Sequence, residues 1–209
     1  KRAVRKFMPG EEFADMLRAA DELVPAGIHA VFTRLGESVT DASEATFVRE
    51  HYLDALDQIK ARGMSCEPSI KPTQLGLDID KEQCFVNLRA LAERAHATGN
   101  YLWIDMEQTS YVDVTLALTR RLKAEFPRVG VCLQAYLYRT KDDLKILVDE
   151  GIGVVQPVGA GERHEVGAQQ GRVGVALVVE ELLPLAHHAQ VTVINHSNVD
   201  LHVFLGYSG

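Results

Sequence analysis

Short apolar runs alternate along the chain with longer stretches in which apolar residues recur at helical spacing. The apolar runs span residues 28–35, 64–70, 101–105, 129–134, 152–155, 191–194 and 199–205. The helical stretches span residues 11–23, 43–63, 80–99, 111–126, 141–150 and 175–188. Compact apolar runs between turn residues predict buried strands, and the longer periodic stretches predict amphipathic helices.

This regular alternation predicts an α/β fold with a parallel sheet. We favour a (β/α) barrel of the TIM type over a doubly wound sheet. A complete barrel usually takes about 250 residues, whereas this chain has 209. We therefore expect a single barrel domain over residues 1–209 that is truncated or incompletely represented at its C-terminal end.

Cap residues mark the ends of two of the predicted helices. Asp41 or Ser43 can cap the helix that stops at Gly63. Similarly, Asp78 or Asp80 opens the helix that stops before residue 99. Residues 159–174, in contrast, are irregular and rich in glycine, which in a compact domain indicates a functional loop or a wrong assignment.

The composition narrows the class of protein. Hydrophobic residues make up 46% of the chain and charged residues 24%, which is typical of a soluble globular domain. The formal net charge of −7 argues against a nucleic-acid partner. No apolar run has the length of a membrane span, and no signal-peptide pattern is present, so we expect a cytoplasmic protein. Because the sequence starts at Lys1 and not at Met, we expect it to begin inside a longer protein.

The cysteines and histidines give no sign of a disulfide framework or a metal site. Cys66, Cys84 and Cys132 are far apart and odd in number, so we expect them to be reduced and structural. His187 and His188 are adjacent and cannot share one face of a helix, and no HExxH motif occurs. We therefore predict no metal site.

Four polar side chains stand where predicted strands end. They are Lys71, Asp105, Gln134 and His196. Because the carboxyl ends of parallel strands meet at one edge, where such folds carry their active sites, we expect these four residues to face a common site.

Lys71, Asp105 and Glu107 could carry chemistry or could be structural. Lys71 could bind a substrate carboxylate, form a Schiff base or be a solvated lysine at a strand end. We expect Asp105 to point into the barrel mouth and to pair with a cation such as Lys71. Glu107 is better suited to capping the helix that begins near Thr109.

The residues after the fourth strand also allow two interpretations. The Gln134 amide could donate to a carbonyl-rich ligand or could tie the rim together. Tyr136, Tyr138 and Arg139 either hold a planar cofactor or begin the next helix. A short Gly-Ala-Gly segment at 159–161 resembles half of a phosphate loop and lacks the third glycine of the dinucleotide motif.

Five segments, taken together, resemble the proline dehydrogenase family. They are residues 4–10, 35–37, 69–77, 103–107 and 129–140. The two most specific are Ser-Ile-Lys-Pro-Thr-Gln-Leu-Gly-Leu around Lys71 and Val-Gly-Val-Cys-Leu-Gln-Ala-Tyr-Leu-Tyr-Arg-Thr around Gln134. Members of this family are flavoenzymes with a (β/α)8 barrel that oxidise L-proline to Δ1-pyrroline-5-carboxylate.

The resemblance implies roles for individual residues and a cofactor, FAD. Lys71 would bind the carboxylate side of the substrate, and Asp105 would be the active-site carboxylate. The remaining residues implied at the flavin are Met106, Gln134, Gly159, Ala160, Asn195 and His196.

The similarity weakens after Glu150. The family motif Arg-Leu-Val-Lys-Gly-Ala-Tyr corresponds to residues 155–161, where Val155, Val158 and Gly161 replace its Arg, Lys and Tyr. The last family helix, whose paired arginines grip the proline carboxylate, has no counterpart in the sequence.

The function implied by the resemblance is FAD-dependent oxidation of L-proline in proline catabolism, with hydride transfer to flavin N5. Electrons would then pass to a quinone or another acceptor. Two alternatives stay open: a Schiff-base barrel lyase that uses Lys71, and a non-catalytic barrel that has lost flavin binding. A homo-oligomer and a peripheral contact with a membrane also stay open.

Overall fold

The computed structural model describes residues 12–23, 29–36, 39–134 and 137–155, and the backbone of residues 190–196 and 198–207. Its strands are β1 (His29–Arg34), β2 (Cys66–Ile70), β3 (Leu102–Asp105), β4 (Val129–Cys132), β5 (Gly153–Val155), β6 (Gln190–His196) and β7 (Asn198–Tyr207). Its helices are α1 (Phe13–Leu23), α2 (Ala42–Arg62), α3 (Lys81–Thr98), α4 (Val112–Glu125) and α5 (Thr140–Asp149), with short 3₁₀ turns η3 (Pro72–Leu75) and η4 (Thr109–Tyr111). These bounds confirm the predicted order of elements through residue 155.

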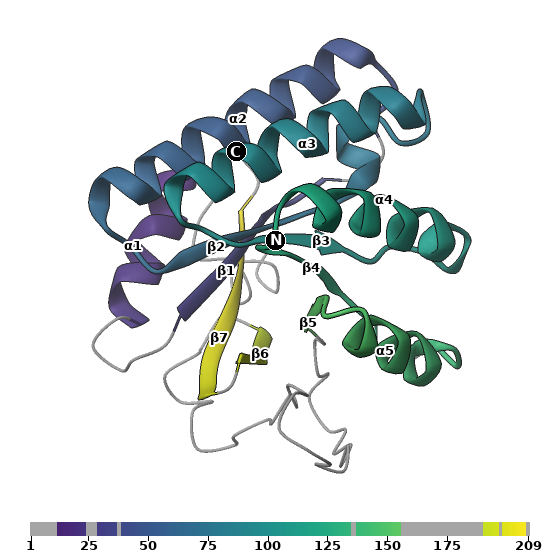
Figure 1. Cartoon of the computed structure of the whole chain (residues 1–209). Helices are drawn as coiled ribbons and strands as arrows, with labels where there is room; N and C mark the ends of the chain where they lie inside the picture. The colour runs from purple at the N-terminus through teal and green to yellow at the C-terminus, as the bar shows by residue number, and fades with distance from the viewer. Residues whose placement is uncertain are drawn as a thin grey trace, which may run out of the picture.

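The strands form one sheet in the order β5-β4-β3-β2-β1-β7-β6. Strands β1 to β5 are parallel to their neighbours, and α2 to α5 connect them along the outer face of the curved sheet (Figure 1). The two edge strands, β5 and β6, also come into contact, so the sheet curves back on itself. The fold is thus α/β and of the barrel type, as the alternation predicts.

The predicted caps define the ends of α2 and α3. The Asp41 carboxylate accepts a hydrogen bond from the Ser43 N–H, and Asp80 accepts from the N–H groups of Glu82 and Gln83. Gly63 ends α2 in the left-handed region at φ 63°, where a residue without a side chain is least strained. Each helix therefore begins and ends where the sequence signals place it.

The pairing of β6 corrects one expectation. We expected residues 191–196 to form a further parallel strand, but β6 pairs with β7 in an antiparallel hairpin. A single residue separates the two strands, and a parallel connection needs a crossover of about a dozen residues. Because β7 is parallel to β1, β6 ends at the edge of the sheet where β1 begins. The predicted helix 175–188 and the loop 159–174 lie outside the described residues.

Side chains alternate between two cores. On the outer face, residues such as Leu88, Leu91 and Ile104 pack between the sheet and the helices. On the inner face, Val31, Trp103, Cys132 and Val155 form a separate cluster. Strands buried on both faces explain why the sequence shows continuous apolar runs and no simple alternation.

Two glycines make room for the large inner side chains. Tyr101 and Trp103 stack with their ring centroids 4.3 Å apart. The strand register places Trp103 beside Gly130 and Gly130 beside Gly153. A Cβ atom at Gly130 would collide with the Trp103 ring and would lie 2.6 Å from the Gly153 carbonyl oxygen. The indole therefore fills space that only glycine leaves open.

We predict that Gly130→Ala lowers the free energy of unfolding by about 2–3 kcal/mol, because neither the buried indole nor a backbone carbonyl can move aside cheaply. Gly63→Ala is the comparison, since nothing lies within 4 Å of its added Cβ and only its left-handed backbone is strained. That variant should lose about 1 kcal/mol. Urea unfolding followed by Trp103 fluorescence measures both, and equal losses would contradict the packing explanation.

Candidate active site at the carboxyl ends of the strands

The structure brings Lys71, Asp105 and Gln134 to the same edge of the sheet. Lys71 directly follows β2, Asp105 is the last residue of β3, and Gln134 comes two residues after β4. The register aligns these ends, because Ile70 pairs with Ile104 and Asp105 pairs with Cys132. We call this edge the rim. The structure thus confirms the prediction that these three residues lie at one edge of the sheet.

The Asp105 carboxyl group is partly buried, and its pKa is raised to about 6. Burial is the main cause, and the nearby Glu107 carboxylate adds to it. The positive charge of Lys71 and a hydrogen bond from the Met106 N–H act in the opposite direction. The carboxyl group can therefore change its protonation state near neutral pH, which is a common property of residues that act in catalysis.

Beneath Asp105 lie neutral groups of β2 and β4. The hydroxyl of Ser69 and the thiol of Cys132 lie 3.4 Å apart, and both residues are buried. Burial and the charge of Asp105 hold the pKa of the Cys132 thiol well above its usual value, so the group stays a thiol. Cys66, Cys84 and Cys132 are all free and buried, which agrees with the structural role expected for them.

Lys71 stands at the start of η3, between two carboxyl groups. Its charge lowers the pKa of both Asp105 and Glu107. Among the ion pairs of the described residues, however, none includes Lys71, so the expected pairing with Asp105 is an attraction without direct contact. The Lys71 ammonium group is thus held near the rim by its backbone and by long-range attraction.

Glu107 fixes the segment that carries Lys71. Its carboxylate accepts hydrogen bonds from the backbone N–H of Thr73, at 3.1 Å, and from the Thr73 hydroxyl. The bond to the N–H holds the η3 turn in place, and η4 has no side-chain cap. The expectation that Glu107 caps the helix near Thr109 is therefore wrong, because a donor from a neighbouring loop is the better placed partner. This tie joins the loop after β2 to the loop after β3.

Gln134 connects β3, β4 and α5. Its side-chain amide donates to the Met106 carbonyl oxygen at 2.7 Å, and its own carbonyl accepts from the Thr140 hydroxyl at 2.6 Å. Of the two interpretations of Gln134, the structure thus shows the one in which it ties the rim together. The second interpretation, donation to a carbonyl-rich ligand, stays a prediction.

The Met106 side chain is not at the rim. It is 2% exposed and packs in an outer cluster with Val112, Leu116 and Leu147. The side chain points away because the next residue after Asp105 faces the opposite side of the sheet, and a flavin contact of Met106 stays a prediction. Only the backbone of Met106 reaches the rim.

Four further residues are implied at a flavin: Gly159, Ala160, Asn195 and His196. Gly159 and Ala160 are outside the described residues. Asn195 and His196 end β6, and the antiparallel hairpin places their backbone at the edge opposite Asp105. The expectation that His196 shares a site with Asp105 is thus wrong, because it assumed a parallel strand.

Tyr138 and Arg139 belong to the start of the next helix. Tyr138 is fully exposed, and the Arg139 guanidinium pairs with Asp143 at 2.7 Å and with Asp113 at 2.8 Å. The pair with Asp113 joins the start of α5 to α4. Arg139 is the N-cap residue of α5 and Tyr138 lies in the turn before it, so these two residues lead into the helix, whereas Tyr136 lies outside the described residues.

Two buried polar residues at the rim were missed by the sequence reasoning. The Gln74 amide donates to the carbonyl oxygens of Arg34, at 3.0 Å, and Gly36, at 2.7 Å. Tyr52 lies on α2, and its hydroxyl oxygen accepts a hydrogen bond from the Arg34 N–H at the rim. The only signal for Gln74 is its place in the segment 69–77, and nothing in the sequence distinguishes Tyr52 from other apolar-face residues of its helix.

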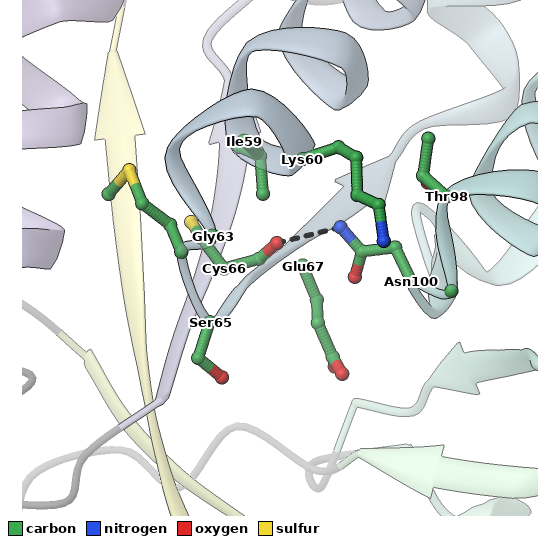
Figure 2. Close-up of a pocket in the computed structure, with 10 residues that line it drawn as sticks. Ile59, Lys60, Gly63, Ser65, Cys66, Glu67, Thr98 and Asn100 are labelled. Atoms are coloured by element: carbon green, nitrogen blue, oxygen red, sulfur yellow. Dashed lines mark hydrogen bonds between the residues drawn. The ribbon is translucent and has the colours of Figure 1, made fainter.

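A pocket of about 300 Å³ lies at the far edge of the sheet, away from the rim. Figure 2 shows it between the ends of α2 and α3 and the start of β2. Its polar groups largely bond within the fold: Asn100 donates to the Cys66 carbonyl at 2.9 Å, and Glu67 accepts from the Trp103 indole N–H at 2.6 Å. We therefore place the candidate site at the rim.

The described part of the chain shows no helix long and apolar enough to span a bilayer. Within the same residues, no group of three or more His, Cys, Asp or Glu side chains is arranged to hold a metal ion.

Comparisons with known proteins agree on one family. The family model described as proline dehydrogenase matches residues 16–153. Proline dehydrogenase 1 of Bacillus subtilis subsp. natto is 33% identical over 145 residues, which are 69% of this chain and 48% of that protein. Proline dehydrogenase of Deinococcus radiodurans is 30% identical over 149 residues, again 69% of this chain and 48% of the relative. The chain thus spans about half the length of the curated relatives it matches.

Solved structures show the same fold. Proline utilization A from Bdellovibrio bacteriovorus, inactivated by N-propargylglycine, superposes with a TM-score of 0.63 at 21% identity, covering 70% of this chain and 18% of that chain. Proline utilization A from Corynebacterium freiburgense gives a TM-score of 0.57 at 23% identity, covering 71% of this chain and 16% of that one.

We predict that Asp105→Asn stabilises the flavin-free protein at pH 8 by up to about 3 kcal/mol and changes little at pH 4. The pKa of about 6 in the folded protein lies above the ordinary aspartate value of 3.8, so the folded state binds the proton more tightly. The wild type therefore loses stability as pH rises from about 4 to 6, and asparagine avoids that loss. Urea unfolding of both proteins across this range measures the difference.

Asp41→Asn is the matched control, because the pKa of that exposed N-cap carboxyl is lowered and not raised. The difference between this variant and the wild type should stay flat between about pH 5 and 8. A flat profile for Asp105→Asn as well would contradict the burial of its charge.

Proposed function

Because the chain belongs to the proline dehydrogenase family, we propose that the protein containing it oxidises L-proline to Δ1-pyrroline-5-carboxylate with FAD. The observation that carries the proposal is the rim itself. It places a cation, Lys71, near a partly buried carboxyl group, Asp105, whose pKa is raised to about 6. Both stand at the carboxyl ends of adjacent parallel strands, the usual position of active sites in barrel folds.

The described residues of the rim fit a flavin. A bound flavin would supply the hydride acceptor. Beneath the rim lie neutral, buried groups, including Ser69 and Cys132, which suit a flat and largely apolar ring. At its edge stands Gln134, whose amide is oriented by its bond to Met106 and would hold a polar edge of the ring. Gly159 and Ala160 remain proposed flavin contacts by resemblance.

Lys71 suits the binding of the substrate carboxylate. Its ammonium group takes part in none of the ion pairs formed by the described residues, so it has a charge to offer a ligand. Glu107 and Gln74 hold the η3 turn that follows it. If the substrate carboxylate bound at Lys71, the rest of the substrate would face Asp105.

Asp105 suits the handling of the substrate's proton. Oxidation of proline removes a hydride from the ring carbon beside the nitrogen and a proton from the nitrogen. A carboxyl group with a pKa of about 6 is mainly ionised above that pH, so it can attract the cationic amine and accept its proton. Lys71 and Asp105 would thus bind the two charged ends of the amino acid.

The wider setting of the reaction is also a proposal. Electrons would pass from the flavin to a quinone or another acceptor. Three free, buried cysteines suit a reducing, cytoplasmic setting. A homo-oligomer and a peripheral contact with the membrane remain compatible with this function.

We predict that the full-length protein purifies with a flavin absorption band that L-proline bleaches under anaerobic conditions. D-proline at the same concentration serves as the control and should leave the band unchanged. A protein that stays colourless when FAD is supplied would contradict the proposal and favour a non-catalytic barrel. A borohydride-trapped imine on Lys71, with no bleaching, would favour a Schiff-base lyase.

We further predict that Lys71→Met raises the KM for L-proline about 10- to 100-fold, because a charge-assisted pair is worth about 1.5–3 kcal/mol. Steady-state kinetics with a fixed electron acceptor measures it. The matched control is Lys60→Met, which removes an exposed lysine at the far pocket. Equal KM values for the two variants would exclude Lys71 from substrate binding.

A further inference from the structure

The hydroxyl of Tyr52 stands between two strands at the rim. Tyr52 is fully buried on α2. Its hydroxyl oxygen accepts a hydrogen bond from the Arg34 N–H at 2.9 Å and donates one to the Ser69 carbonyl oxygen at 3.2 Å. The side chain of a helix thus links the last residue of β1 to β2.

The strand register shows what this hydroxyl replaces. The Ala30 N–H donates directly to the Ser65 carbonyl at 3.2 Å. In a parallel ladder this bond recurs every second residue, so the Arg34 N–H would reach the Ser69 carbonyl. The ladder instead stops at the pair Phe32 and Pro68. Tyr52 therefore takes the place of the next bond.

The inserted hydroxyl separates the two strands just below Lys71. Ser69 is in β2 and Lys71 directly follows the strand with extended backbone, so these residues, two apart, point to the same face. A direct hydrogen bond would place the Arg34 nitrogen about 2.9 Å from the Ser69 carbonyl oxygen. With the Tyr52 hydroxyl between them, two hydrogen bonds in succession join these atoms. Without the hydroxyl, β2 would shift toward β1 on the order of 1–2 Å, carrying Lys71 with it.

Other contacts fix the turn after Lys71 from both sides. They do not set the distance between β1 and β2, which we assign to Tyr52. Glu107 binds Thr73 from the β3 side, and Gln74 binds Arg34 from the β1 side. Both act on η3, after Lys71. Tyr52 is the contact that acts before it, on the strand itself.

We propose that Tyr52 is a positioning residue for substrate binding: its hydroxyl sets the spacing of β1 and β2 at the rim and thereby the place of Lys71. The proposal rests on the proposed role of Lys71 toward the substrate carboxylate. A misplacement of about 1 Å can cost about 100-fold in rate, so the loss of one hydroxyl would be visible in kinetics.

The test compares Tyr52→Phe with Tyr101→Phe in the full-length, flavin-loaded protein. Tyr101 is also a largely buried tyrosine that donates to a backbone carbonyl, that of Val129 at 3.3 Å, but at the far edge of the sheet. Both variants lose a buried hydroxyl, so both should unfold at a lower temperature. Only Tyr52→Phe should raise the KM for L-proline, about 10- to 100-fold, with the flavin spectrum unchanged.

Two further measurements separate positioning from stability. The dissociation constant of a ring carboxylate that cannot be oxidised should rise by the same factor as KM. Fluorotyrosine incorporated at position 52 keeps the ring and a weaker acceptor hydroxyl, so it should give a smaller rise even if Tyr52→Phe does not fold.

The outcomes distinguish this inference from the proposed function. A wild type that does not oxidise L-proline would overturn the proposed function. A wild type that does, with a Tyr52→Phe variant that binds proline normally, would overturn the positioning role alone. Equal losses of affinity in Tyr52→Phe and Tyr101→Phe would also overturn it, since they would reflect general loosening of the fold.

Discussion

The burial of the Asp105 carboxyl group is the constraint on which the rim depends. Removing this group from water disfavours its charge, and the nearby Glu107 carboxylate disfavours it further. Only the attraction to Lys71 and a hydrogen bond from Met106 oppose these effects. Lys71 thus offsets part of the cost of a negative charge on Asp105, and it is also the group that we propose binds the substrate carboxylate.

The structure supports this arrangement with rigid, neutral packing from below and with ties from the sides. Trp103 fills the inner face over Gly130, so strands β3 and β4 cannot slide without a collision. Glu107 and Gln74 fix the turn after Lys71 from neighbouring loops. A site held by residues whose own positions are locked can keep its reacting groups in place, which is the structural requirement for positioning a substrate.

Much of the fold could be predicted from the sequence because its signals are local. Apolar runs and helical spacing gave the elements through residue 155, and Asp41 with Gly63 bounded α2 as expected. The strand ends also predicted that Lys71, Asp105 and Gln134 would meet. The parallel assignment of β6 failed, although the short segment between residues 196 and 198 allows only a hairpin.

The details of the site depended on contacts between distant segments, and these left no local signal. Glu107 was expected to cap its own helix, but its partner Thr73 lies in another loop. Met106 was expected at a cofactor, but its side chain points to the outer core. Tyr52 could not be recognised, because a tyrosine on the buried face of a helix is ordinary until its hydroxyl is placed between two strands.

The most direct test of the account is a crystal structure of the flavin-loaded, full-length protein with a non-oxidisable cyclic carboxylate. The account predicts that the ligand carboxylate lies within ion-pair distance of the Lys71 ammonium group and that its ring lies at the rim beside Asp105. A ligand bound elsewhere, for example in the pocket beside Asn100, would contradict the assignment of the rim as the substrate site.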